Sequence, residues 1–116
     1  MINIQGIAPN MIANNLTPAY PTHPGEVLKD EIEYRGVPQK KLAESMNVSY
    51  TLLNEVLNGK RPVNTEFALL VEAALDLSAE PLLKMQARYN MFVAKRNSKF
   101  LEKLNNVRKI TAAAVL

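Results

Sequence analysis

The stretch that decides the fold runs from Gln39 to Arg61 and reads QKKLAESMNVSYTLLNEVLNGKR. Two short helices that cross steeply through a tight turn need a small residue inside the first helix and a turn residue that tolerates left-handed backbone angles. Ala43 and Asn47 meet these requirements, because asparagine adopts left-handed angles more readily than other non-glycine residues. The remaining contact positions are apolar, at Leu42, Val48, Leu53 and Val56. The spacing predicts a helix-turn-helix; a plain helical bundle that happens to share it is the alternative.

A helix is also expected on the N-terminal side of this stretch, over residues 24–35. Leu28 and Ile32 lie one turn apart on one face of it, which is the spacing of a core-facing helix. Thr22 is a candidate N-cap, and Gly36 is a candidate stop.

The two helices of the central motif are expected at about residues 38–46 and 49–58, with Ser49 as the N-cap of the second. A fourth helix is expected after Asn64 or Thr65, and its inward face is predicted to comprise Phe67, Leu70, Val71 and Ala74. A fifth helix is expected to begin near residue 78, with an apolar stripe that includes Leu82, Met85, Tyr89 and Val93.

These patterns predict an all-α chain with three parts. Residues 1–21, which contain three prolines and no sustained period, are expected to be an irregular N-terminal arm. Residues 22–96 are expected to form a five-helix domain around the helix-turn-helix. Residues 97–116 are expected to be a basic helical extension, with apolar residues at Leu101, Leu104 and Val107.

Composition excludes several classes of protein. The chain has 116 residues, of which 47% are apolar, enough for one compact domain. It contains no cysteine, which excludes disulfides and thiolate metal sites, and no apolar run approaches the roughly 20 residues that span a bilayer. The N-terminus lacks the pattern of a signal peptide, so a cytoplasmic protein is expected. The single histidine, His23, has no obvious catalytic partner and is assigned to capping or packing, so neither catalysis, a metal nor a cofactor is expected.

The net charge of +3 is modest, but its distribution is uneven. Between residues 84 and 109 only Glu102 opposes a series of basic residues, namely Lys84, Arg88, Lys95, Arg96, Lys99, Lys103, Arg108 and Lys109. Such asymmetry suggests a polyanionic partner, although a solvated helix face gives the same pattern.

In a helix-turn-helix the second helix enters the major groove of DNA with its N-terminal residues facing the base edges. Thr51 and Leu52 suit contact with thymine methyl groups, and Asn54 suits pairing with adenine. Glu55 suits acceptance from a cytosine amine or pairing with a neighbouring lysine. The predicted contacts on this helix are Ser49, Tyr50, Thr51, Leu52, Asn54, Glu55 and Asn58, with simple capping as the alternative role of Ser49.

The flanks of the motif suit contacts with the DNA backbone. Gln39, at the start of the first helix, is expected to direct its amide and backbone N–H at a phosphate. Lys60 and Arg61 follow the second helix directly and are expected to bind phosphates as well.

At this point the sequence resembles a known family. Residues 21–28 (PTHPGEVL), residues 54–61 (NEVLNGKR) and residues 86–90 (QARYN) are similar to motifs of HigA-type, VapI-like antitoxins in the XRE, or lambda-repressor-like, helix-turn-helix family. The resemblance implies a homodimer that binds a palindromic operator upstream of its own operon and neutralises a RelE-like, mRNA-cleaving toxin. It also implies operator contacts at Ser49, Tyr50, Thr51, Asn54, Lys60 and Arg61, and a dimer interface on the fifth helix.

Two other functions stay open on the sequence alone. One is a stand-alone XRE-type regulator without a toxin partner, and the other is a protein-binding module with weak DNA affinity. The C-terminal extension suits a dimer helix, a toxin-binding helix or a DNA-backbone contact. A membrane partner is not expected, because the extension has Phe100 as its single bulky aromatic.

Overall fold

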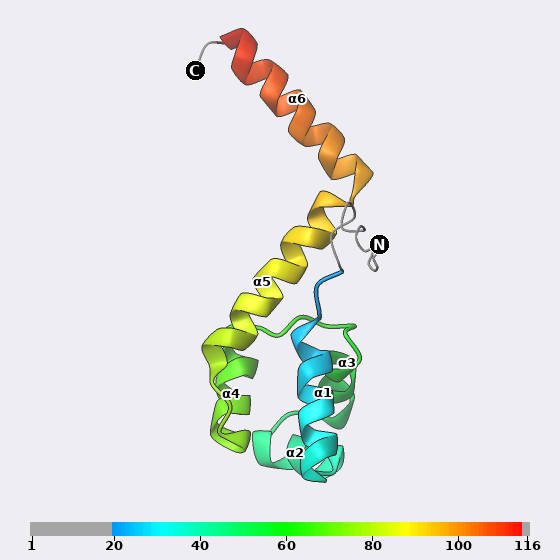
Figure 1. Cartoon of the computed structure of the whole chain (residues 1–116), viewed down its shortest axis with the longest axis vertical. Helices are drawn as coiled ribbons and strands as arrows, with labels where there is room; N and C mark the ends of the chain where they lie inside the picture. The colour runs from blue at the N-terminus through cyan, green and yellow to red at the C-terminus, as the bar shows by residue number, and fades with distance from the viewer. Residues whose placement is uncertain (1–19, 115–116) are drawn as a thin grey trace, which may run out of the picture.

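A computed structural model describes residues 20–114 of the chain (Figure 1). The predicted arm lies largely outside these residues. Within them the chain forms helices only, which confirms the all-α prediction; in chain order they are α1 (Pro24–Arg35), α2 (Gln39–Met46), α3 (Tyr50–Leu57), α4 (Thr65–Leu75), α5 (Ala79–Lys95) and α6 (Ser98–Ala114).

The start of α1 differs from the prediction. His23, not Thr22, is the N-cap, and its Nδ1 accepts a hydrogen bond of 2.9 Å from the backbone N–H of Gly25. The reason is Pro24, which forces the preceding residue into an extended conformation, here φ −71° and ψ 135°. The helix ends as predicted at Gly36, whose φ of 69° is left-handed.

The turn between α2 and α3 confirms the helix-turn-helix geometry. Asn47 is left-handed, with φ 58° and ψ 42°, and its N–H bonds back to the last turn of α2. Ser49 then caps α3, because its Oγ accepts a 3.0 Å hydrogen bond from the N–H of Leu52. Pro38 offers no such side-chain cap to α2.

The buried face of α4 differs from the prediction at two of four positions. Asn64 caps this helix through a 2.8 Å hydrogen bond from the N–H of Phe67 to its Oδ1. The buried residues are Phe67, Ala68, Val71 and Leu75. Leu70 and Ala74, which were predicted to face inward, are exposed. The reason is that α4 packs against both α2 and α5, and in this position it turns Ala68 and Leu75 into the core in their place.

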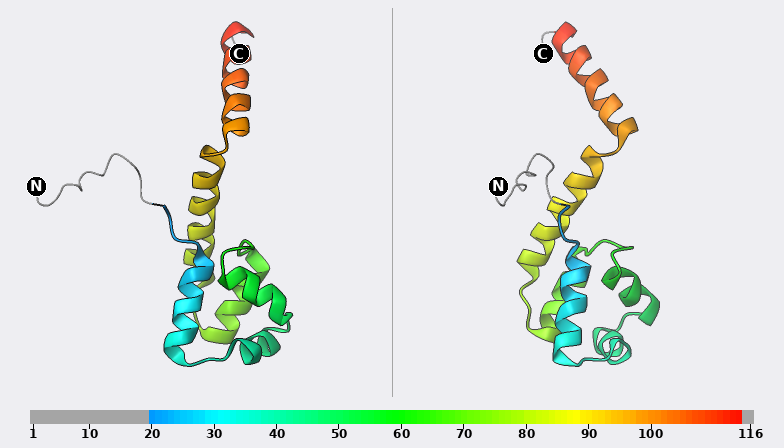
Figure 2. Two further views of the ribbon diagram at one scale, coloured as in Figure 1. Left: turned by 90° about the vertical axis from the view of Figure 1, so that its right-hand side faces the viewer. Right: turned by 45° about the vertical axis from the view of Figure 1, so that its right-hand side comes forward.

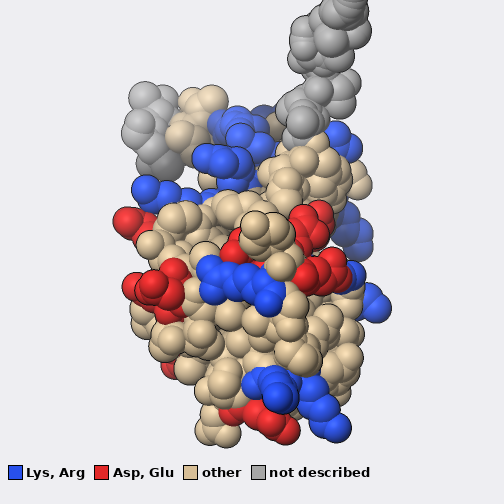
Figure 3. All heavy atoms as spheres, turned by 60° about the horizontal axis from the view of Figure 1, so that its bottom comes forward, with Lys and Arg blue, Asp and Glu red and all other residues tan. Residues whose placement is uncertain are grey.

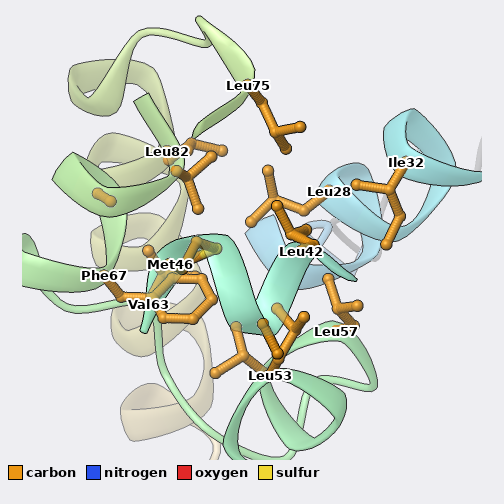
Figure 4. Close-up of a cluster of buried hydrophobic side chains, with 14 of the residues drawn as sticks. Leu28, Ile32, Leu42, Met46, Leu53, Leu57, Val63, Phe67, Leu75 and Leu82 are labelled. Carbon is orange, nitrogen blue, oxygen red and sulfur yellow. The ribbon is translucent and has the colours of Figure 1, made fainter. Parts of the chain in front are cut away.

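The core lies where α1 to α4 and the first turns of α5 meet (Figure 4). Leu28 and Ile32 from α1 face Leu53 and Leu57 from α3, and Val63 contributes from the loop before α4. The core also includes Leu42, Ala43, Met46, Val56, Phe67, Ala68, Val71, Leu75, Ala79 and Leu82. All core residues predicted for α1, α2 and α3 are therefore buried.

The predicted apolar stripe of α5 is buried only at its start. Leu82 is in the core and Tyr89 is half-buried, but Val93 is 42% exposed. A polar residue, Gln86, is buried instead. Its Oε1 accepts a hydrogen bond of 2.7 Å from the N–H of Val63, and its Nε2 donates a hydrogen bond of 2.8 Å to the Oδ1 of Asn90. The second half of α5 extends beyond the bundle, which is why its stripe stays exposed (Figure 1).

Helix α6 stands away from the bundle in every view (Figures 1 and 2). It is a new helix rather than a continuation of α5, because the Oδ1 of Asn97 caps it through a 3.0 Å hydrogen bond from the N–H of Phe100. Its larger apolar side chains are exposed, including Phe100, Leu101, Val107 and Ile110. Between residues 20 and 114, no helix is long and apolar enough to cross a lipid bilayer.

Candidate nucleic-acid interface

Helix α3 presents its N-terminal end to solvent. Ser49, Tyr50 and Thr51 are exposed there, Tyr50 by 52%, while Leu53 on the opposite face is buried. Tyr50 lines a shallow hollow together with Gln39 and Lys40 of α2. Gln39 and the exposed start of α3, which were predicted from the sequence to bind DNA, therefore share one open surface, and the structure adds Lys40 to it.

Leu52 is placed differently from its neighbours. It is half-buried and lines a narrow hollow between α3 and the start of α4, beside Val56 and Phe67. Only part of its side chain is accessible, so it offers less surface to a base edge than Thr51 does.

A chain of hydrogen bonds links three helices across the predicted interface. Asn54 Nδ2 donates 3.1 Å to the Oε1 of Gln39, which ties α3 to α2. Asn58 Nδ2 donates to both the backbone oxygen and the Oδ1 of Asn54, at 2.9 and 3.2 Å. Lys29 of α1 then donates 3.1 Å from its Nζ to the Oδ1 of Asn58. Lys29 is a residue that the sequence did not point to, because it lies 29 positions away from its partner.

Which groups donate and which accept in this network follows from the groups at its two ends. A lysine ammonium group only donates and a backbone carbonyl only accepts, so the amide of Asn58 is oriented from both sides. Each amide in turn uses its oxygen inside the network, so that among residues 20–114 the Nε2 hydrogens of Gln39 and one Nδ2 hydrogen of Asn54 have no acceptor. The network therefore offers donors, which suit phosphate oxygens and the acceptor edges of bases.

Glu55 and Arg61 form an ion pair at the edge of this surface. Arg61 Nε donates to Glu55 Oε1 at 2.6 Å, and the side chains of Arg61 and Glu55 remain 55% and 37% exposed. Of the two roles considered for Glu55, pairing with a cation describes the structure, although the cation is an arginine and not a lysine. Lys60 is exposed beside it.

Beneath the loop after α3, a row of aromatic rings joins α1 to α5. The ring of His23 meets Tyr89 edge-on, with centroids 4.9 Å apart, and Tyr20 packs on Tyr89 and Phe92 at 5.9 and 4.5 Å. Arg96 lies over the ring of Phe92, 4.6 Å from its centroid. Burial raises the pKa of Tyr89, and its hydrogen bond with Tyr20 adds to the increase. The sequence showed these aromatics without their contacts, because two segments far apart in the chain supply them, residues 20–23 and residues 89–92.

Charge by itself does not mark the interface. Figure 3 shows the end of the molecule that lies lowest in Figure 1, and acidic and basic side chains alternate over it between wide uncharged areas. Between residues 20 and 114, no group of three or more His, Asp or Glu side chains is arranged to hold a metal ion. The candidate site is therefore defined by the exposed part of α3 and its polar network.

Comparison with known proteins agrees with this geometry. A model of the helix-turn-helix family matches residues 28–82. Virulence-associated protein A′ of Dichelobacter nodosus is 31% identical over 72 residues, which cover 61% of this chain and 63% of that protein. The chain thus matches slightly less than two thirds of this relative.

Two solved structures are similar over most of their length. One is an addiction module antidote protein of the HigA family from Coxiella burnetii, 28% identical with a TM-score of 0.64, covering 73% of this chain and 95% of that one. The other is the Pseudomonas aeruginosa antitoxin HigA, solved with the higBA promoter. It is 27% identical with a TM-score of 0.63, and the match covers 72% of this chain and 92% of that one. Residues 28–82 therefore belong to the helix-turn-helix family, and the chain that carries them is similar to antidote proteins of the HigA type.

Proposed function

We propose that this protein is a sequence-specific DNA-binding antitoxin that represses its own operon and neutralises a RelE-like, mRNA-cleaving toxin. The observation that carries the DNA-binding part is the exposed N-terminal end of α3, which Ser49 caps and whose opposite face is locked in the core. The likeness to a HigA antitoxin solved with its promoter supports the same function.

In this proposal α3 lies in the major groove, and its exposed residues read the bases. Tyr50 and Thr51 face the base edges, and the accessible part of Leu52 adds apolar contact with a thymine methyl group. Asn54 and Asn58 belong to the network that positions this surface, and the free Nδ2 hydrogen of Asn54 points to an acceptor on a base.

The flanking residues hold the DNA backbone. The free Nε2 hydrogens of Gln39 suit a phosphate oxygen, and the exposed ammonium group of Lys60 suits another. Arg61 reaches a phosphate only if the attraction of the phosphate exceeds that of Glu55, its partner in the free protein.

The proposal includes a homodimer, formed through the part of the chain that leaves the bundle. Met91 and Val93 on α5 and Leu101, Val107 and Ile110 on α6 are all at least 38% exposed. Exposed apolar side chains on two consecutive helices support an interface in this part of the chain. Two recognition helices about 34 Å apart would then meet successive turns of the major groove. In this reading residues 22–96 form the DNA-binding domain and residues 97–116 an extension that serves association.

DNA binding is tested with the duplex upstream of the protein's own gene and a scrambled duplex of the same length at near-physiological salt. Selective binding is expected. Lys60→Ala is expected to weaken binding to both duplexes and to lower the salt slope by about one, because it removes one phosphate contact. Asn54→Ala is expected to cost about 1–3 kcal/mol on the operator and less on the scrambled duplex. Equal affinity of the unaltered protein for the two duplexes would refute sequence-specific binding.

Toxin neutralisation is tested separately, by co-expressing the product of the adjacent gene and measuring growth and co-purification. Rescue of growth with a stable complex is expected. Selective DNA binding without any partner would instead indicate a stand-alone regulator, and a stable complex without selective DNA binding would indicate a protein-binding module.

A further inference from the structure

We propose that His23 is a positioning residue for the loop Asn58–Arg61, and that it holds the backbone that presents Lys60 and Arg61 to DNA. This inference rests on the proposed DNA-binding function. It goes beyond that function because His23 itself lies away from the exposed surface of α3 and is only 2% exposed.

The imidazole ring connects two segments that are far apart in the sequence. Its Nδ1 accepts a hydrogen bond of 2.9 Å from the N–H of Gly25 and so caps α1. The Arg61 backbone also counteracts part of the burial-induced lowering of the ring's pKa, which brings the loop into the surroundings of the ring. Because Nδ1 accepts, the proton of the neutral ring lies on Nε2. One ring thus caps the helix and lies beside the loop.

Packing fixes the ring against the same loop. A Cβ atom added to Gly59 would lie 3.7 Å from Cγ of His23, in ordinary van der Waals contact, so the ring lies next to this glycine with room for about one methyl group between them. Gly59 has a left-handed φ of 75°, and its N–H bonds 3.0 Å to Val56, so the loop turns sharply at this contact. Tyr89 of α5 closes the other side of the ring edge-on.

Adding a proton to this ring would break the arrangement. A proton on Nδ1 would face the N–H of Gly25, so donor would meet donor at the cap. Burial lowers the pKa of His23, while Glu26 and the Arg61 backbone oppose that shift in part. Tyr89, the titratable group in edge-on contact with the ring, has a raised pKa and stays neutral near pH 7. His23 is the only histidine in the chain, so an effect that requires it is assigned to one group.

The position of the loop should therefore depend on pH. The ordinary pKa of histidine is about 6.5, and the lowered value in the fold keeps the ring neutral and the loop in place at neutral pH. As the pH falls through that lowered value the ring gains its proton, the loop is released, and affinity for DNA of any sequence is expected to fall several-fold.

The decisive variant is His23→Asn. Asparagine is a good N-cap, so it keeps the hydrogen bond to Gly25 but removes the ring beneath Gly59 and the titration. Thr22→Ala, at the exposed neighbouring residue, is the matched control. The first measurement is DNA affinity in a pH series that starts at about pH 7.5, above the ordinary histidine pKa of about 6.5, and extends downward as far as the protein stays folded. The second is the backbone amide resonances of Gly59, Lys60 and Arg61 without DNA over the same series.

We expect His23→Asn to bind both operator and scrambled DNA several-fold more weakly at the start of the series, with a smaller further loss of affinity as the pH falls than the unaltered protein shows. The three loop resonances should shift, and those of the unaltered protein should titrate together. Affinity and loop resonances that match the control would overturn the inference. If the unaltered protein bound no DNA, the proposed function would fail, and the loop resonances would still decide whether His23 positions the loop.

If His23→Asn proves too unstable, His23→Gln provides the same comparison with a longer acceptor side chain. A variant that is less stable but keeps the DNA affinity and the pH response of the unaltered protein would show a purely structural residue and would refute the inference.

Discussion

Gly25→Ala should destabilise the fold severely, although alanine is normally favoured in a helix. A Cβ atom on Gly25 would lie 1.8 Å from the carbonyl oxygen of Val56 in α3, whereas contacts under 3.0 Å are essentially never observed. The first turn of α1 and the end of α3 would have to separate by about 1.2 Å. Neither group is the flexible end of a side chain, so the backbone itself must move.

The cost follows from what this separation opens. Overpacking that side chains alone relieve costs about 1–3 kcal/mol. Here the packing of α1 against α3, two helices that both supply core residues, would also loosen, and a gap of about 1 Å forfeits up to about half of the dispersion attraction across it. We therefore expect a loss of about 3 kcal/mol or more, which exceeds the gain of about 1 kcal/mol in helix propensity.

The assay is urea unfolding followed by helical circular dichroism, at one fixed protein concentration because association would shift the midpoint. The control is Gly36→Ala. Gly36 has a left-handed φ of 69° with no atom within 4 Å of an added Cβ, so alanine there costs only backbone strain, about 1–2 kcal/mol. If Gly25→Ala cost no more than Gly36→Ala, the close approach of α1 and α3 would not be present in solution.

Three further predictions concern the core, the ion pair and the buried histidine. Phe67→Ala should lower the free energy of unfolding by about 3–5 kcal/mol, whereas Leu69→Ala on the exposed face of α4 should change it by no more than about 0.5 kcal/mol in the same urea assay. Glu55→Gln should tighten binding to all DNA and steepen its salt dependence by up to about one, because it frees Arg61; binding titrations at several salt concentrations would contradict this if the slope did not change. The free energy of unfolding should be largest above about pH 6.5 and should fall as the pH drops toward the lowered pKa of His23, since the unfolded chain binds the proton more readily. Urea midpoints across this range should flatten in His23→Gln, and an equal slope in the two proteins would assign the effect to other groups.

Much of the local structure could be predicted from the sequence. The turn at Asn47, the caps at Ser49 and Asn64 and the stop at Gly36 depend on interactions between residues within about four positions of each other. Such interactions appear in the sequence as particular residue types at particular spacings, which is why most helix boundaries agree to within a residue or two.

The exposure of the candidate site's residues could be predicted from the sequence, but their contacts could not. Tyr50, Thr51 and Lys60 were expected to be exposed, because they fall on the outward side of a helix or in the loop after it. The engagement of Asn54 with Gln39 could not be foreseen, since it depends on the distance between two helices. That contact changes the prediction for Asn54, from a free reader of adenine to a member of a network with one donor left.

The sequence by itself therefore determined the bounds of the first three helices to within a residue or two, the start of α4, and which surface of α3 faces outward. Only the tertiary structure decided which row of α4 is buried, that Lys29 meets Asn58 across 29 residues, and that α1 lies close enough to Val56 to require glycine at position 25. It also brought His23 beneath Gly59. The physical reason is that periodicity defines the faces of one helix, whereas contacts between helices depend on their rotation and separation, which the packing of all their side chains sets together.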